Sequence, residues 1–249
     1  DRVIVVPRLK THQLTYYTGA VKVLFGYIPG LRKAEYHLHG GTTARTFAGL
    51  LLDLHSALPP ALAVMDAVVG MEGQGPSRGH PREIGLVLAS ESCTALDWTA
   101  CSVIGFDPGE IPTVRMAADR GDGPRDPGEV EILGEAPEGV RIDGFEKPRT
   151  MLLARVPPAL IHAAGFFLGT RPSIQPGRCI SCGKCADACP PKVIRWAKGE
   201  VPSIRYRHCI RCYCCQELCP QGAVEVAYPW IRRVMGRGGG EVGFYPSRW

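Results

Sequence analysis

Two short cysteine runs in the last third of the chain have the residue types and spacing that bind inorganic clusters. One reads Cys179-Ile-Ser-Cys182-Gly-Lys-Cys185-Ala-Asp-Ala-Cys189-Pro190, and the other reads Cys209-Ile-Arg-Cys212-Tyr-Cys-Cys215-Gln-Glu-Leu-Cys219-Pro220. Both follow C-x2-C-x2-C-x3-C-P, in which three thiolates of one loop surround a [4Fe–4S] cubane and the fourth cysteine binds the neighbouring cluster. The repeated spacing therefore predicts two [4Fe–4S] clusters, a cofactor that passes single electrons.

The exchange of fourth cysteines assigns four expected ligands to each cluster. Those of the first cluster are Cys179, Cys182, Cys185 and Cys219. Those of the second cluster are Cys209, Cys212, Cys215 and Cys189. Zinc knots are the main alternative, but they use two C-x2-C pairs at longer separation and seldom the third cysteine and the proline. Two complete runs in succession favour iron–sulfur clusters.

The remaining cysteines have no ligand spacing. We expect Cys214 to be structural or to donate a hydrogen bond, and Cys93 and Cys101 to be small buried residues of a helix. A secreted disulfide scaffold would be shorter and rich in cysteine throughout, whereas this chain has an odd total of 11 cysteines in 249 residues, most of them clustered. The pattern predicts a reducing compartment, the cytoplasm.

Positive charge is concentrated around the cysteine runs. Residues 171–249 contain 13 lysines and arginines against 5 acidic residues, although the whole chain has a net charge of only +5. These cations could form a docking face for an acidic redox partner or offset the charge of the clusters, and the sequence leaves both readings open. No basic element interleaved with aromatic residues predicts nucleic-acid binding. The apolar stretch Val156–Gly169 contains two prolines and is too short to span a membrane.

The chain before the cysteine runs alternates strand-like and helix-like segments. Strand-like runs occur at Arg2–Val6, Ala61–Val69, Ile84–Ala89 and Val130–Leu133, with a glycine-rich turn at 70–76. Helices are expected after Thr42 or Thr43, after Ser90 or Ser92, from Pro112 to Gly121, and over Pro157–Leu168. This order predicts an α/β domain with a mostly parallel sheet.

Composition shifts suggest three regions. We expect the α/β domain to cover residues 1–171, a small α+β ferredoxin-like domain with two clusters to cover residues 172–228, and a basic tail to cover residues 229–249. The chain starts without methionine and directly in a strand-like run, so we expect further residues of the α/β domain to precede Asp1.

Polar residues near the ends of the expected strands are candidates for catalysis. In open α/β sheets, ligands bind beyond the carboxyl ends of the strands. Lys10 and His12 follow the first strand and could share a face, and Asp66, Glu72 and Glu91 fall near the ends of the next two strands. These side chains could converge on one pocket for an anionic or metal-bound ligand, or each could be an ordinary solvated charge or helix cap.

Several segments in order resemble the uncharacterised iron–sulfur-centre family known as domain of unknown function 362. The similar segments are 7–12 (Pro-Arg-Leu-Lys-Thr-His), 19–26, 65–76 and 95–97 (Ala-Leu-Asp). Members that resemble this chain append a two-cluster ferredoxin domain with the same Cys-Tyr-Cys-Cys run. Val23 stands where the family pattern usually has asparagine. The resemblance implies a fold and a cofactor but no reaction, and the family's remote similarity to nickel-dependent lactate racemases is an analogy.

Three functions are compatible with these observations. The first is electron transfer between the clusters and a ligand or partner at the α/β domain. The protein would then be an oxidoreductase or the electron-transfer component of one. The second is a non-redox, racemase-like enzyme that uses Lys10, His12 and Asp66, which requires His12 and Asp66 to reach one substrate site. The third is storage or delivery of clusters, which predicts exposed clusters. Electron transfer predicts that one cluster lies near the strand ends of the α/β domain. The redox partner or substrate and the oligomeric state are not identified by the sequence.

Overall fold

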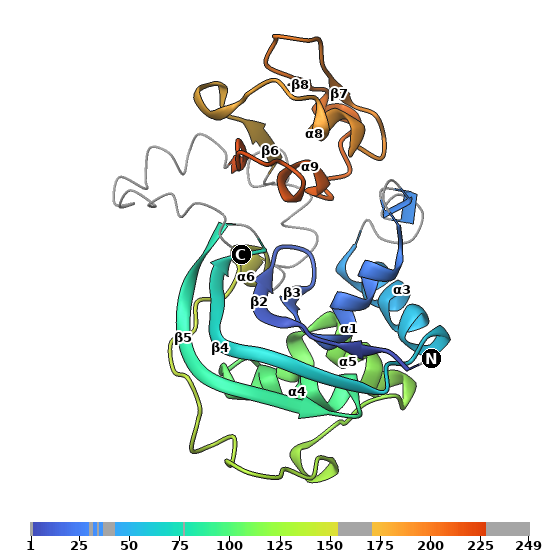
Figure 1. Cartoon of the computed structure of the whole chain (residues 1–249), viewed down its shortest axis with the longest axis vertical. Helices are drawn as coiled ribbons and strands as arrows, with labels where there is room; N and C mark the ends of the chain where they lie inside the picture. Colours follow the sequence, from blue (N-terminus) through green and yellow to red (C-terminus); the bar gives the residue numbers. More distant parts are fainter. Residues whose placement is uncertain are drawn as a thin grey trace.

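The computed structural model describes residues 2–29, 32–33, 35–36, 43–76, 78–153 and 171–227. Its larger part is an α/β domain, and its smaller part carries the cysteine runs (Figure 1). The strands of the α/β domain are β1 (Ile4–Val5), β2 (Arg8–His12), β3 (Tyr16–Thr18), β4 (Leu62–Gln74) and β5 (Arg78–Ser90). Its α-helices are α1 (Ala20–Val23), α3 (Ala44–Ala57), α4 (Cys93–Val103), α5 (Pro112–Arg120) and α6 (Arg149–Leu153), with 3-10 turns η1 (Leu24–Tyr27), η2 (Pro108–Glu110) and η3 (Pro127–Glu129).

The sheet is built around the long strand β4. β1 and β2 both run parallel to β4, as the α/β prediction requires, and β3 returns antiparallel to β2. β5 pairs antiparallel with β4 along its whole length. The α/β class is therefore confirmed, with parallel pairing at the centre of the sheet and an antiparallel hairpin added to it.

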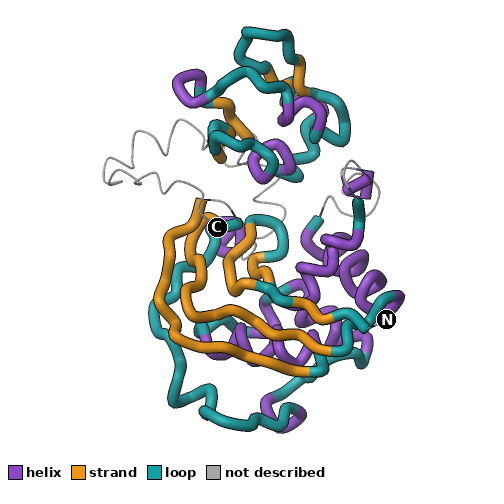
Figure 2. The backbone as a smooth tube through the Cα atoms, viewed as in Figure 1, coloured by secondary structure: helices purple, strands orange, loops and turns teal. Residues whose placement is uncertain are grey.

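Helices cover one face of this sheet (Figure 2). Ala63, Met65 and Ala67 of β4 are buried and belong to the main hydrophobic core, which also includes residues of α1, α3, α4 and α5. Val68 and Val87 remain exposed. The alternation of buried and exposed positions along β4 is the pattern of a sheet with one covered face.

The expected helix boundaries are confirmed where the structure describes them. The Thr43 side chain accepts a hydrogen bond from the Thr46 backbone N–H and starts α3, and Ser92 accepts one from Ala95 and starts α4. Gly121 ends α5 in the left-handed conformation that glycine adopts without strain. The predicted helix at Pro157–Leu168 and the predicted tail at 229–249 lie outside the described residues.

Two strand predictions and one turn prediction need correction. The strand expected at Arg2–Val6 is shorter than its run of residues, because β1 covers only two of them. Ile4 and Val6 are exposed, since β1 is an edge strand of the sheet. Val130–Leu133 forms no strand, since no neighbouring strand pairs with it in the described chain and Leu133 is 88% exposed. The expected turn at 70–76 is mostly strand, because β4 continues to Gln74.

Close packing explains why glycines occupy the end of β4. A Cβ atom on Gly70 would lie 2.6 Å from Cδ1 of Ile84, and one on Gly75 would lie 2.1 Å from the Thr11 carbonyl oxygen. These glycines therefore allow β4 and the start of the following turn to approach β2 and β5. Considered from the sequence alone, the glycines of residues 70–76 indicate a turn. In the structure they instead allow close contact between neighbouring strands.

The small domain contains two copies of one structural unit, each built around one cysteine run. Its elements are β6 (Arg171–Ile174), η4 (Pro176–Arg178), α8 (Lys184–Asp187), β7 (Ile194–Arg195), β8 (Ser203–Ile204), η5 (Tyr206–His208), α9 (Cys214–Glu217) and β9 (Val224–Ala227). β6 pairs with β9 and β7 pairs with β8, both antiparallel. A short strand follows each cysteine run, β7 after the first and β9 after the second. The domain limits proposed above, 1–171 and 172–228, stay a prediction.

Left-handed backbone positions recur in both units. Equivalent pairs with positive φ are Ser181 and Arg211, Gly183 and Tyr213, and Lys192 and Gly222. Four of these six residues are not glycine, and such residues rarely adopt this conformation unless the surrounding structure requires it. The same backbone path is thus imposed on two different sequences.

Candidate iron–sulfur centre

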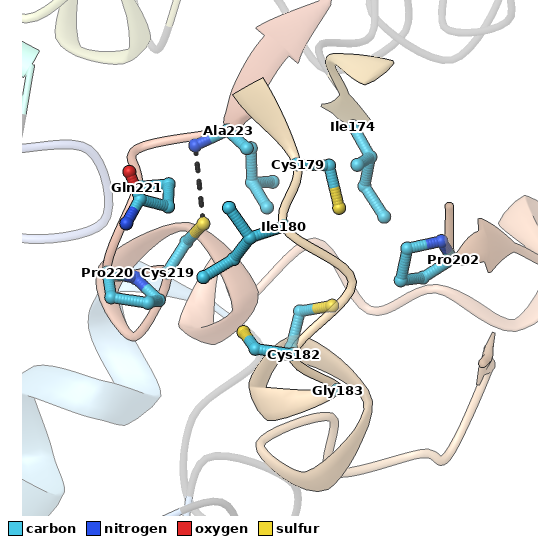
Figure 3. Close-up of a pocket in the computed structure, with 12 residues that line it drawn as sticks. Ile174, Cys179, Ile180, Cys182, Gly183, Pro202, Cys219, Pro220, Gln221 and Ala223 are labelled. Carbon is cyan, nitrogen blue, oxygen red and sulfur yellow. Dashed lines mark hydrogen bonds between the residues drawn. The ribbon is translucent and has the colours of Figure 1, made fainter. Parts of the chain in front are cut away.

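The expected ligands of the first cluster line one pocket of the small domain. Cys179, Cys182, Cys185 and Cys219 surround it together with apolar residues that include Ile174, Ile180, Pro202 and Val224. Figure 3 shows Cys179 and Cys182 on one loop, with Cys219 approaching from the other repeat. The first three cysteines and the fourth therefore come from different runs.

The expected ligands of the second cluster line a second pocket in the same way. Cys209, Cys212 and Cys215 come from the second run and Cys189 from the first. The other lining residues are Pro172, Pro190, Pro191, Val193, Ile194, Ile204, Ile210 and Tyr213. The helices α8 and α9 carry the crossing, because each leads from a cysteine in one pocket to a cysteine in the other.

Backbone amides point at several of these sulfurs. The N–H of Ser181 donates to Sγ of Cys179 at 3.4 Å, and the N–H groups of Val193 and Ala223 donate to Cys189 and Cys219 at 3.4 and 3.2 Å. The last two bonds occupy equivalent positions in the two repeats. Hydrogen bonds to cluster sulfurs tune reduction potential, and here they are fixed by the backbone path.

The donor set fits a cubane better than a single ion. A zinc ion draws its thiolates to about 2.3 Å from one point. Four thiols spread around each apolar pocket are instead suited to a larger inorganic core, for which residues of both runs would supply the ligands.

The extra cysteine, Cys214, is buried beside the second pocket without lining either one. It takes the place that Lys184 has in the first repeat, at the start of the short helix. Cys93 and Cys101 are both fully buried in the core of the α/β domain, as expected for small packing residues.

Of the candidate catalytic residues, Lys10 and His12 do lie together. Both are on β2, and both are within electrostatic range of Lys22 and Glu217. Burial, reinforced by the positive charge of Lys22, lowers the pKa of both side chains below their ordinary values. The predicted shared face of this strand is therefore found, although the residues lie within the strand rather than after it.

Asp66 and Glu72 do not join this pair. Asp66 lies opposite Arg8, which donates to its carboxylate at 2.8–2.9 Å, and the register shift that follows places Met71 opposite Lys10. The Glu72 carboxylate accepts from the backbone N–H of Glu146. The convergence expected from strand ends was wrong, because these residues lie inside β4 and an antiparallel β5 carries Glu91 to the opposite end of the sheet.

A residue that sequence reasoning missed, Glu217, connects the two parts of the molecule. Nδ1 of His12 accepts from the backbone N–H groups of Leu14 and Thr15, so the ring proton sits on Nε2. Nε2 then donates to Oε1 of Glu217 at 3.2 Å. Burial lowers the pKa of His12 and so favours the neutral imidazole, for which this contact is a hydrogen bond.

This bond brings the β2 end of the sheet to the second pocket. Glu217 is on α9, two residues after Cys215 and two before Cys219, and its charge is felt at Cys212. In Figure 1, α9 lies on the side of the small domain that faces β2 and β3. No signal in the sequence distinguished Glu217 from Asp187, which has the equivalent place in the first repeat.

Comparison with known families agrees with both parts of this description. Residues 1–102 match the family described as "Domain of unknown function (DUF362)", and residues 178–223 match the family described as "4Fe-4S dicluster domain". The first part of the chain is thus similar to DUF362 domains, and the part with the cysteine runs is similar to 4Fe-4S dicluster domains. The resemblance inferred from the sequence is thereby confirmed, and the DUF362 match ends within α4.

A curated relative gives no reaction. The chain is 34% identical over 152 residues to the "Thylakoid-associated protein sll1697" of Synechocystis sp.. The match includes 61% of this chain and spans about half (47%) of the relative's length. Within the described residues, no helix combines the length and apolar character needed to cross a bilayer.

Proposed function

We propose that this protein is an electron carrier with two [4Fe–4S] clusters, which exchanges electrons with a ligand or partner held by the DUF362 domain. Cys179, Cys182, Cys185 and Cys219 hold one cluster in this proposal. Cys209, Cys212, Cys215 and Cys189 hold the other. When bound, such clusters supply single-electron transfer, most often at low potential.

The observation that carries the proposal is the sorting of eight thiols between two pockets. Each pocket receives three cysteines of one run and the last cysteine of the other, as ligand exchange between two cubanes requires. The apolar lining supports the same reading, since a low-dielectric shell around a cluster influences its potential.

The contact between His12 and Glu217 supports an electron path toward the DUF362 domain. It places the hairpin β2–β3 next to the helix that carries Cys215. The positively charged Lys10 and Lys22 lie near this contact. A bound molecule that gains negative charge on reduction would be stabilised by these cations.

The exposed cations Arg195, Arg205 and Arg207 support an external partner of acidic character. Arg195 is on β7, Arg205 precedes η5 and Arg207 lies within η5, close to the second cysteine run. A positive face of this kind raises the rate of encounter with a negatively charged redox protein.

Metal and redox analysis under anaerobic conditions tests the proposal. We expect about eight irons and eight acid-labile sulfides per chain and two reversible one-electron steps. A matched pair of variants controls the count: Cys214→Ser should keep all iron, whereas Cys215→Ser should lose about half of it. Zinc in place of iron, or equal iron loss in both variants, would contradict the proposal.

The non-redox alternative has less support. It needs His12 and Asp66 at one site, but the Asp66 carboxylate contacts Arg8 and the His12 ring contacts Glu217. Cluster delivery predicts exposed clusters, whereas of the eight expected ligands only Cys182 is exposed, four are half-buried and three are buried. Both fail if the iron remains bound through repeated cycles of reduction and oxidation and the electrons are recovered.

We further propose a cytoplasmic location, because clustered thiols require reducing conditions. The name of the relative suggests a membrane-associated alternative for this chain. Cell fractionation distinguishes the two: the proposal requires recovery in the supernatant, and sedimentation with washed membranes would contradict it.

A further inference from the structure

A cleft of about 390 Å³ opens on the DUF362 domain beside the β2–β3 hairpin. Its volume falls in the range of roughly 300–1,000 Å³ that small-molecule sites occupy. Residues from five elements line it, which is typical of a site formed by the tertiary structure rather than by one loop. Among them are Tyr16 of β3, Arg45 of α3, Glu110 of η2, Arg115 and Met116 of α5, and Met151 of α6.

The lining combines an apolar part with positive charge. Tyr16, Met116 and Met151 supply the apolar surface, and methionine adapts its shape to an apolar guest. Arg45 and Arg115 are exposed at the cleft, and no hydrogen bond or ion pair engages either guanidinium among the described residues. Two arginines without partners are suited to a carboxylate or phosphate.

The acidic residues of the cleft leave it with net positive charge. Glu110 is paired with Lys147, whose Nζ lies 3.5 Å from its Oε2. Asp119 lies one helical turn after Arg115 and offsets only one of the two guanidinium charges. The cleft therefore favours an anion with a single carboxylate over a cation or a neutral molecule.

The position of Tyr16 links the cleft to the cluster domain. Tyr16 is paired directly with His12 across the hairpin, and His12 donates to Glu217 of α9. Tyr16 has a left-handed backbone (φ 64°), a conformation that non-glycine residues seldom keep away from functional sites. The hairpin is also held by Thr150, which donates to the Gln13 carbonyl at 2.6 Å.

We propose that this cleft is the ligand site of the DUF362 domain and that it binds a small organic acid with an apolar body. The inference rests on the proposed function in one respect: it gives the chemical class of the molecule that the domain is proposed to hold.

Anaerobic titration calorimetry of the cluster-loaded full chain tests the inference with three probes. 2-Naphthoate has both required features, acetate has the carboxylate alone, and naphthalene-2-methylamine has the apolar body with a positive charge. We expect saturable binding of 2-naphthoate and none of the other two. The double variant Arg45→Gln/Arg115→Gln should weaken 2-naphthoate binding at least tenfold.

A matched control keeps the result specific. Arg2→Gln/Arg141→Gln removes the same charge from exposed positions that do not line the cleft, and should bind 2-naphthoate as the natural protein does. Three outcomes overturn the inference: no binding by the natural protein, a loss smaller than tenfold in the cleft variant, or an equal loss in the control.

Iron and sulfide counts on the same samples separate this inference from the proposed function. A full complement of clusters with no binding in the cleft overturns the inference alone. Specific binding by a chain that cannot hold iron overturns the proposed electron transfer and leaves the cleft as a ligand site.

Discussion

The last cysteine of each run lines the pocket that holds the other three cysteines of the opposite run. Cys189 belongs to the first run by sequence but lines the pocket of the second, and Cys219 does the reverse. This is the exchange of fourth cysteines that the spacing of the two runs predicts, and it can be tested one cysteine at a time.

We predict that Cys189→Ala removes the same electron paramagnetic resonance signal as Cys212→Ala. Both cysteines line the second pocket, so loss of either should impair the same cluster. Cys185→Ala should remove the other signal, and Cys214→Ala should keep both. If Cys189→Ala and Cys185→Ala affected the same signal, the crossing of ligands would be disproved.

The buried carboxyl group of Asp97 should make the stability of the protein depend on pH. It accepts hydrogen bonds from the backbone N–H groups of Ala20 and Val21 at 2.6 and 3.0 Å, and from the Tyr17 hydroxyl. Burial raises the pKa of Asp97 to about 7, against these hydrogen bonds, which lower it. In the folded protein the group thus keeps its proton at a pH where the unfolded chain has lost it.

Stability should consequently fall between about pH 4 and pH 7 through Asp97. In this window the folded state binds more protons than the unfolded state, so the free energy of unfolding decreases as pH rises and levels off above pH 7. The change is on the order of a few kcal/mol. Thermal unfolding of Asp97→Asn measured in parallel should lack this component. A difference between the two proteins that is constant with pH would refute the prediction.

At the scale of elements, one glycine controls how α1 meets α4. A Cβ atom on Gly19, just before α1, would lie 2.0 Å from Oδ1 of Asp97 and 2.3 Å from the Tyr17 hydroxyl oxygen. Only glycine lets the carboxylate on α4 reach the first N–H groups of α1. The start of α1 is therefore stabilised by a contact with α4, a helix that is distant along the chain.

Gly19→Ala should destabilise the protein by more than about 2 kcal/mol, because the new methyl group breaks buried hydrogen bonds or displaces α1. Gly26→Ala is the matched control, since a Cβ atom there would have no neighbour within 4 Å. Its free energy of unfolding should change by less than about 1 kcal/mol. Equal denaturation midpoints for the two variants would show that the close contact does not matter.

At the scale of the whole molecule, the positive charge of the cluster domain should govern encounter with redox partners. Arg195, Arg205 and Arg207 are exposed around the second cysteine run, whereas the acidic residues are mostly in the other domain. Charge of one sign near the reacting group accelerates reaction with a partner of opposite sign and does so less at high salt.

We predict that the reduced protein reacts faster with ferricyanide at low ionic strength than at high ionic strength, and that hexaamminecobalt(III) shows the opposite trend. Replacing Arg195, Arg205 and Arg207 with glutamate should reverse both trends. The same change at the exposed Arg2, Arg32 and Arg141 of the other domain should have little effect. Stopped-flow rates that respond equally in both triple variants would rule out a local docking face.

The sequence by itself determined the chemistry of the small domain. The thiol spacing within each run, and the proline after each fourth cysteine, are local properties that fix how a short loop can present its sulfurs. Helix starts at Thr43 and Ser92 were predictable for the same reason, because a cap involves neighbours three residues away.

Only the tertiary structure decided which polar residues meet. Whether His12 faces Asp66 or Glu217 depends on strand register and on the position of a distant helix, and neither leaves a local pattern in the sequence. The glycines at the end of β4 and just after it were misread for this reason. Gly75 is needed because of its close contact with the Thr11 carbonyl, which is near in space but remote along the chain. The cleft beside Tyr16 is likewise assembled from five separate elements, so its existence follows from packing and not from any motif.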